Sequence, residues 1–523
     1  MEFQSFQNIE KATLMNRGEL FRIGTALLFI VGIMLFTYGR IAVGENGVLL
    51  VIAAMIGGYM AMNIGANDVA NNVGPAVGSR ALTMTGAILI AIVFEAGGAL
   101  IAGGDVVSTI KKGVIDPDMI PSTDAFIWAM MAALLAAAIW LNLATAIGAP
   151  VSTTHSIVGG VLGAGIAAGG WGIAHWATVG KIAASWVISP VLGGIIAATF
   201  LYIIKRSIVY QTDKVSAAKK VVPFLVAFMA WAFSTYIVLK GLKKLWKFDF
   251  LQAAGIGLAV AVLVFIIVTP LVARASKRLE NNRDAVNKLF VVPLIFAAAL
   301  LSFAHGANDV ANAVGPLAAI NEAVLNGGIA AKASIPLWVM LVGAIGIALG
   351  LALYGPKLIR TVGSEITKLD QMRAFCVAMA AAITVIIASQ LGLPVSSTHI
   401  AVGGIFGIGF LREFLEANWA RTIDEIRDHH DGADSDAVDE FLDRYEAAPM
   451  HEKGAMLKRL KARSATANLY KKERKRLLRH YRTALVKRSM LLKIAAAWVI
   501  TVPLAGILSA LLYFTIRGML FTG

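Results

Sequence analysis

The chain has 523 residues, of which 58% are hydrophobic and 15% are charged, with a formal net charge of +15. Soluble domains carry about a quarter charged residues, and a water-soluble fold of this size could not bury so much apolar surface. Together with a mean hydropathy of +0.73, the composition argues against a soluble enzyme, a disordered chain and a nucleic-acid binder. It predicts an all-α, polytopic protein of the cell (inner or plasma) membrane. The single cysteine, Cys376, leaves no disulfide framework and no Cys-based metal site.

Several apolar runs are long enough, or nearly so, to cross a bilayer, because a helical span needs about 20 mostly apolar residues. In chain order they are Phe21–Tyr38, Gly47–Met62, Leu82–Ala102, Ala125–Ile147, Trp176–Ile204, Val221–Leu239, Phe250–Val272, Leu289–Ala304, Pro336–Leu353, Met372–Leu391 and Leu491–Ile516. Two shorter stretches, Ile157–Ala168 and Ile400–Phe410, are predicted to be half-helices or re-entrant segments. We therefore expect about 11–12 transmembrane helices.

Two sequence motifs occur twice. Residues 65–75 read GANDVANNVGP, and residues 306–316, at an offset of 241, read GANDVANAVGP. Residues 150–160 read PVSTTHSIVGG, and residues 394–404, at an offset of 244, read PVSSTHIAVGG. Self-similarity at a fixed offset is the signature of internal repeats, so the chain consists of two homologous halves.

A hydrophilic stretch, residues 411–488, interrupts the second half. The match of Trp186 with Trp498 raises the offset to 312 residues, which places an insertion inside the second copy. This stretch is acidic at first and basic later, and apolar residues such as Phe441 and Tyr445 recur at helical spacing. We predict a pair of amphipathic helices outside the membrane, lying against each other through their opposite charges.

The repeats and the insertion predict six segments along the chain. They are an N-terminal segment with an extra transmembrane helix (1–46), the first repeat (47–204), connecting helices and a linker (205–288), the first part of the second repeat (289–410), a hydrophilic insertion expected in the cytoplasm (411–488), and the last transmembrane helix of the second repeat (489–523).

The first repeated motif places amide and carboxylate side chains within apolar segments. They lie within about one helical turn in each copy: Asn67, Asp68 and Asn71, then Asn308, Asp309 and Asn312. A carboxylate in the bilayer interior is costly, so it should face a cavity, a cation or a proton-bearing substrate. Pro75 and Pro316 are expected to end the turn, which predicts a discontinuous helix with the polar cluster at its break. Ordinary helix caps are the plainer alternative, but the identity of the two copies favours a functional role.

The second repeated motif supplies hydroxyl groups after a proline: Ser152, Thr153 and Thr154, then Ser396, Ser397 and Thr398. Free N–H groups and the positive end of the helix dipole converge at a helix N-terminus, so this pattern predicts an anion site. Plain N-caps are the alternative reading of the same residues. We interpret His155 and His399 as structural residues, because neither has a second ligand at metal-binding spacing.

The chemistry of the carboxylates bears on the identity of the anion. Phosphate at neutral pH carries at least one proton and can donate hydrogen bonds to Asp68 and Asp309, whereas sulfate has no proton to donate. The carboxylates therefore favour phosphate over sulfate. Discontinuous helices in corresponding positions of two repeats mark the binding site of a transporter.

These paired motifs resemble those of the inorganic phosphate transporter (PiT) family. The resemblance implies an inverted-repeat, homodimeric carrier that moves phosphate with Na⁺ or H⁺ by alternating access. It implies that phosphate contacts Asp68, Asn71, Asp309, Asn312 and the six hydroxyl residues, and that Asn67, Asp68, Asn308 and Asp309 bind the cation, with Na⁺ as one candidate. Glu95 matches an acidic position of the family in the span after the first motif, which implies that it too belongs to the cation-binding residues, and an ionisable residue within a span favours function.

Three other functions compete with a phosphate symporter. The first is a sulfate or other oxyanion permease of the same fold. The second is a membrane enzyme acting on phosphorylated lipids, but neither motif contains the Arg or Lys that such a site needs. The third is a channel, which the paired broken helices disfavour. We therefore predict a transporter with no enzymatic activity and no cofactor other than its coupling ion, with phosphate, Na⁺ or H⁺ and membrane lipids as its partners.

Overall fold

The computed structural model describes residues 2–40, 47–149, 151–241, 246, 248–326, 335–364, 369–416, 435–448, 456 and 488–520. The chain divides into two compact units. One comprises Met1–Ile405 with Met490–Gly523, and the other comprises Phe406–Ser489. Within the described residues the structure is helical, apart from an isolated bridge between Ile115 and Ala174.

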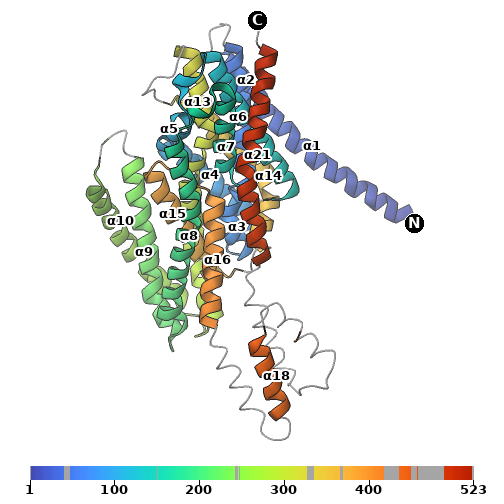
Figure 1. The fold of residues 1–523 in the computed structure, drawn as a ribbon. Helices are drawn as coiled ribbons and strands as arrows, with labels where there is room; N and C mark the ends of the chain where they lie inside the picture. The colour runs from blue at the N-terminus through green and yellow to red at the C-terminus, as the bar shows by residue number, and fades with distance from the viewer. Residues whose placement is uncertain are drawn as a thin grey trace. The chain divides into compact units, whose positions relative to one another are not determined.

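The larger unit contains eleven helical segments that are long and apolar enough to cross a membrane, counted over the described residues. This confirms the predicted polytopic helical fold and identifies a multi-pass membrane protein. Its helices are α1 (Glu2–Tyr38), α2 (Gly47–Asn67), α3 (Ala70–Gly78), α4 (Met84–Ala102), α5 (Gly104–Lys112), α6 (Thr123–Ile147), α7 (Thr153–Gly169), α8 (Trp176–Ile204), α9 (Lys214–Lys240), α10 (Phe250–Ser276), α11 (Arg283–Asn287), α12 (Val291–Asp309), α13 (Ala311–Asn326), α14 (Leu337–Ser364), α15 (Gln371–Gln390), the start of α16 (Ser397–Glu416) and most of α21 (Arg488–Leu520). Helices α9 and α10 lie side by side (Figure 1).

The second unit contains α18 (Ser435–Ala447). Phe441 and Tyr445 stack on one face of this helix, with ring centroids 5.9 Å apart, and Arg444 pairs with Glu440. The helix is amphipathic, as predicted. The rest of the predicted helix pair, including the whole basic part of the insertion, lies outside the described residues.

Both copies of the first motif interrupt a helix. Asp68 and Val69 separate α2 from α3, and Val310 separates α12 from α13. The expectation that the Gly-Pro pairs end these turns is wrong, since Pro75 lies inside α3 and Pro316 lies inside α13. Neighbouring helices allow a membrane helix to retain a proline. Pro75 and Pro316 have no N–H to donate to the carbonyls four residues earlier, those of Asn71 and Asn312.

The helices of the two repeats pack reciprocally. Helix α2 packs on α14 just as its counterpart α12 packs on α4, and α2 contacts α6 as α12 contacts α15. Helix α3 contacts α15 as α13 contacts α6. This exchange of partners is expected for two repeats related by an approximate two-fold axis, in which each half completes the core of the other.

Glycines at equivalent positions allow these helix pairs to approach closely. A Cβ atom on Gly65 would overlap the carbonyl oxygen of Ile347, and one on Gly350 would overlap that of Met62. Gly306 and Gly98 make the same two contacts between α12 and α4, with Glu95 and Phe303. Small residues drive close packing in membranes, where no hydrophobic force brings the helices together.

We expect Gly350→Ala to destabilise the protein, because the new methyl group meets backbone atoms that cannot rotate away. The expected cost is about 1–3 kcal/mol or more, visible as a lower melting temperature of the purified protein in detergent. Gly255→Ala in α10 is the matched control, since nothing lies within 4 Å of a Cβ at that position. Equal melting temperatures for the two variants would contradict the close approach of α2 and α14.

Candidate functional site

The side chain of Asp68 lies at the break between α2 and α3 and is fully buried. Its Oδ1 accepts a hydrogen bond of 2.7 Å from the hydroxyl of Thr398, and its Oδ2 accepts one of 2.5 Å from the hydroxyl of Thr153. The backbone N–H of Thr153 lies 3.4 Å from the same Oδ2. One carboxylate is therefore held by hydroxyl groups from both repeats.

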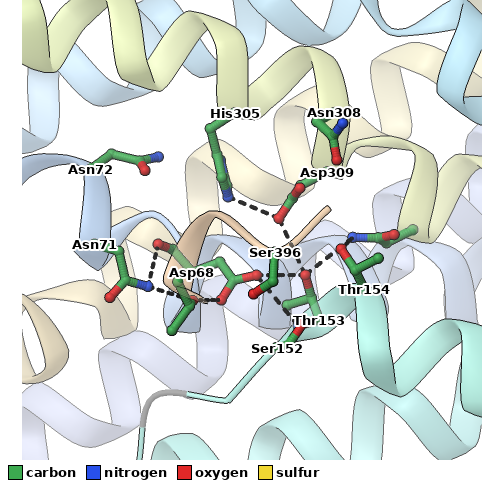
Figure 2. A network of polar contacts seen from close by, with 12 residues as sticks. Asp68, Asn71, Asn72, Ser152, Thr153, Thr154, His305, Asn308, Asp309 and Ser396 are labelled. Atoms are coloured by element: carbon green, nitrogen blue, oxygen red, sulfur yellow. Dashed lines mark hydrogen bonds and ion pairs between the residues drawn. The ribbon is translucent and has the colours of Figure 1, made fainter. Parts of the chain in front are cut away.

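Asp309 lies at the equivalent break between α12 and α13, and its surroundings differ. Its Oδ2 is 3.3 Å from the hydroxyl of Thr153 and 2.9 Å from Nε2 of His305. Thr153 thus lies between the two carboxylates (Figure 2). A hydroxyl has a single proton to donate, and the shorter distance assigns that proton to Asp68.

Asn71 and Asn312 reach across to the opposite repeat. The amide of Asn71 donates to the hydroxyl of Thr398 at 2.7 Å. In the same way, the amide of Asn312 donates to the hydroxyls of Thr153 at 3.1 Å and Thr154 at 3.2 Å. Each half-helix is thereby cross-linked to a hydroxyl segment of the other half.

Asn67 holds the loop that leads into α7. Its Nδ2 donates to the hydroxyl of Thr145 at 2.9 Å and to the carbonyl of Ala149 at 3.2 Å, and its Oδ1 accepts from the backbone N–H of Val151. Asn308 makes the equivalent three bonds to Ser389, Leu393 and Val395, the counterparts of those residues in the second repeat. In each copy, the amide nitrogen and the amide oxygen of the asparagine therefore both bind the loop that leads into the next helix.

The two hydroxyl segments form the start of α7 and α16. Ser152 and Ser396 act as N-caps and accept hydrogen bonds from the backbone N–H groups of His155 and His399. The plainer reading, an N-cap, therefore holds for these two serines. In each repeat the short helix packs back on the preceding one, since Gly160 meets Ala133 of α6 and Gly404 meets Val377 of α15.

The N-termini of α7 and α16 face each other. The hydroxyl of Thr154 donates to the carbonyl of Val395 at 3.0 Å, and the rings of His155 and His399 are 4.4 Å apart. The first turns of both helices therefore bring N–H groups and hydroxyls to one place. His155 also packs on Trp186, with ring centroids 3.8 Å apart, which agrees with a structural role.

A buried chain of ionisable groups extends from Asp309 to the first repeat. Nδ1 of His305 lies 2.7 Å from Oε2 of Glu95, and Oε1 of Glu95 accepts from the amide of Asn72 at 2.7 Å. Neither His305 nor Asn72 was predicted as a site residue from the motifs. The signal for His305 was present, because it stands four residues before Asp309 and the two share one helix face.

The chain of groups joins the two halves, and it has no counterpart at the position related by the repeats. Gly306 contacts Glu95 and the equivalent Gly65 contacts Ile347, so Ile347 is the counterpart of Glu95. Ile64 is the counterpart of His305, because the two are separated by the motif offset of 241 residues. Ala313 likewise replaces Asn72. The polar contacts around Asp309 have no equivalent around Asp68, so the site is only partly symmetric.

The structure brings most of the predicted site residues together at the junction of the two repeats. Asp68, Asp309, Asn71, Asn312, Thr153, Thr154 and Thr398 are joined by the bonds above, and Ser397 is buried among the described core residues. Glu95 reaches Asp309 only through His305. Ser152, Ser396, Asn67 and Asn308 shape the loops around the site.

Several buried oxygen atoms at this junction have no hydrogen-bond partner within the described part of the chain. They are Asn71 Oδ1, Asn312 Oδ1, Asp309 Oδ1 and Ser397 Oγ. Buried polar groups are nearly always paired, and amide and carboxylate oxygens are ligands for hard cations. One atom each from Asp68, His305 and Asp309 also lies within 4.8 Å of the others. These oxygen atoms could therefore serve as ligands for a cation bound next to an anion.

The fold and the site together define a membrane carrier built from two repeats. The broken helices α2/α3 and α12/α13 and the N-termini of α7 and α16 meet at one buried polar site. The model of the Phosphate transporter family matches residues 64–509, and the chain belongs to this family. It is a transporter, not an enzyme.

Similar proteins agree with this assignment. A protein of Helicobacter pylori (strain J99) named "Putative phosphate permease" is 53% identical over 98% of both chains. One of the same name from Pyrococcus furiosus is 40% identical over 71% of this chain and 89% of its own. A solved structure, "The sodium-dependent phosphate transporter", is 32% identical, with a TM-score of 0.74, and the match covers 90% of this chain and 100% of that one.

We expect Glu95→Leu to destabilise the protein strongly, because it removes one partner of a buried ionic contact and leaves His305 facing a leucine. Such a loss costs about 3–5 kcal/mol. Ile347→Leu, at the equivalent place in the other repeat, is the matched control and should cost less than about 1.5 kcal/mol. Thermal unfolding in detergent measures both. A cost for Glu95→Leu as small as that of the control would show that the Glu95–His305 contact contributes little.

Proposed function

We propose that the protein is a secondary active transporter that imports inorganic phosphate by symport with Na⁺ through alternating access. The meeting of two helix N-termini and their threonine hydroxyls with two buried carboxylates carries the proposal. The N–H and hydroxyl groups supply donors for an oxyanion, and the carboxylate and amide oxygens supply ligands for a cation.

The carboxylates support phosphate as the anion. Asp68 and Asp309 both approach the hydroxyl of Thr153, so an anion bound by the hydroxyls lies next to acceptors. Such an arrangement repels an anion without protons and accepts hydrogen bonds from one that carries them. Binding of the anion also requires Thr153 and Thr398 to turn their hydroxyl protons away from Asp68, which couples the anion to the charge state of that carboxylate.

Na⁺ is the coupling ion that we favour, and H⁺ is the alternative. The oxygen atoms of Asp68, Asp309, Asn71 and Asn312 supply the ligands, together with the carbonyls of Asn71 and Asn312, which lose their usual donor four residues later to Pro75 and Pro316. The sodium dependence in the name of the similar solved structure supports this choice. Asn67 and Asn308, predicted as cation ligands, are better explained as positioning residues, because their amides hold the hairpin loops.

The test is uptake of radiolabelled phosphate into proteoliposomes that contain the purified protein. An inward Na⁺ gradient and an inward H⁺ gradient are imposed separately, with excess sulfate as competitor. We expect the Na⁺ gradient to drive accumulation that sulfate does not block, and Asp309→Asn to abolish it. Accumulation with H⁺ alone would overturn Na⁺ coupling, and full competition by sulfate would favour the sulfate permease.

Thr153→Val tests the central hydroxyl. The substitution keeps the shape of the side chain and removes a hydrogen bond to a charged group, which contributes about 1.5–3 kcal/mol. Phosphate uptake at subsaturating concentration should therefore fall about tenfold or more. Thr269→Val, on a half-buried threonine of α10 outside the site, is the control and should leave uptake unchanged. Equal uptake by both variants would remove Thr153 from the site.

The homodimer and the segment boundaries stay predictions. Crosslinking in native membranes, followed by mass determination of the product, tests the dimer.

A further inference from the structure

A cavity with charged residues in its wall lies between α1, α2, α6 and α14, with a volume of about 950 Å³. Asn63 and Ala66 of α2 and Thr145 of α6 form part of its wall. The hydroxyl of Thr145 accepts a hydrogen bond from Asn67, which directly precedes Asp68. Thr145 therefore belongs both to the wall of this cavity and to the polar network of the central site.

Cations dominate the charged groups of this cavity. Arg22 of α1 and Lys357 and Arg360 of α14 line it, against a single carboxylate, that of Glu19. We call it the cationic cavity. Neither repeated motif contains an arginine or a lysine, so these side-chain cations lie beside the central site and outside its motifs.

Lys357 connects the cationic cavity with the α6–α7 hairpin. Its Nζ donates to the carbonyl of Ala146 at 2.7 Å, in the last turn of α6. The loop that follows contains Ala149 and Val151, which Asn67 holds. The cationic wall is thus fixed to the loop that leads to the hydroxyls of Thr153 and Thr154.

The two cations of α14 have no counterpart in the other half. At the offset of 252 residues that relates Gly350 to Gly98, Lys357 and Arg360 correspond to Asp105 and Ser108. The two repeats therefore differ in the charge beside their central helices. The third cation, Arg22, comes from α1, the helix that precedes the first repeat.

We propose that the cationic cavity binds a phosphate group and serves as a staging site for inorganic phosphate on its way to the central site. This rests on the proposed function. Clefts lined by one sign of charge concentrate the oppositely charged ligand and raise its association rate. The apolar side chains of α1 in the wall, such as Ile23 and Leu27, also suit the phosphate of a lipid headgroup, so the test separates the two sources.

The experiment compares Lys357→Gln/Arg360→Gln with wild type in proteoliposomes, as a function of phosphate concentration and ionic strength. We expect the KM for phosphate to rise roughly tenfold at low salt with kcat unchanged. The difference should shrink at 1 M salt, where the Debye length is about 3 Å. The control Lys277→Gln/Arg278→Gln removes the same charge from exposed positions after α10 and should match wild type.

The outcomes separate the staging site from the proposed function. If wild type fails to accumulate phosphate, the proposed function is wrong. If wild type accumulates phosphate and the cavity variant has the KM and salt dependence of the control, the staging site is wrong. Melting temperatures with and without phosphatidylglycerol test the other source. If that lipid stabilises wild type and not the cavity variant, while KM is equal, the cavity holds a lipid phosphate and staging is overturned.

Discussion

The buried carboxylate of Asp68 is the constraint on which the site depends. A charge in a membrane interior needs partners, and the chain supplies them from both repeats, through Thr153 and Thr398. These contacts require a helix break at Asp68, helices α7 and α16 whose N-termini meet, and loops held by Asn67 and Asn308. The reciprocal packing of α2 with α14 and of α12 with α4 brings these parts into register.

The two-fold relation between the repeats holds for the backbone contacts of the central helices, but it does not hold for their charged side chains. Glycines at equivalent positions set the same helix contacts in both halves, whereas Glu95 and His305 stand opposite Ile347 and Ile64. Two carboxylates contact the two ring nitrogens of His305, and both nitrogens can donate only in the imidazolium form. The proton count of this group therefore sets the net charge beside Asp309, and also beside Asp68, which lies within 4.8 Å of His305.

Much of this arrangement could be predicted from the sequence, because repetition singles out residues that composition cannot. The duplicated motifs predicted the breaks at Asp68 and Asp309 and the hydroxyl segments that meet them. The partners that pair across the repeats could not be predicted. Asn71 and Thr398, for example, are more than 300 positions apart, and their contact depends on tertiary packing that the motif spacing does not encode. Pro75 was misread because proline usually ends helices in water, whereas here the surrounding helices retain it.

The one-sided ionic chain has a consequence for the resting protein. In a carrier with two equivalent halves, exchange of the conformations of the halves interconverts two forms of equal free energy, and the substrate gradient alone decides which face is open. Because the contacts of Glu95 with His305 and Asn72 have no counterpart at the repeat-related position, the two forms expected under alternating access differ in free energy before any solute binds. Under the proposed alternating access, the empty carrier therefore has a preferred face, and its return step across the membrane runs faster in one direction than in the other.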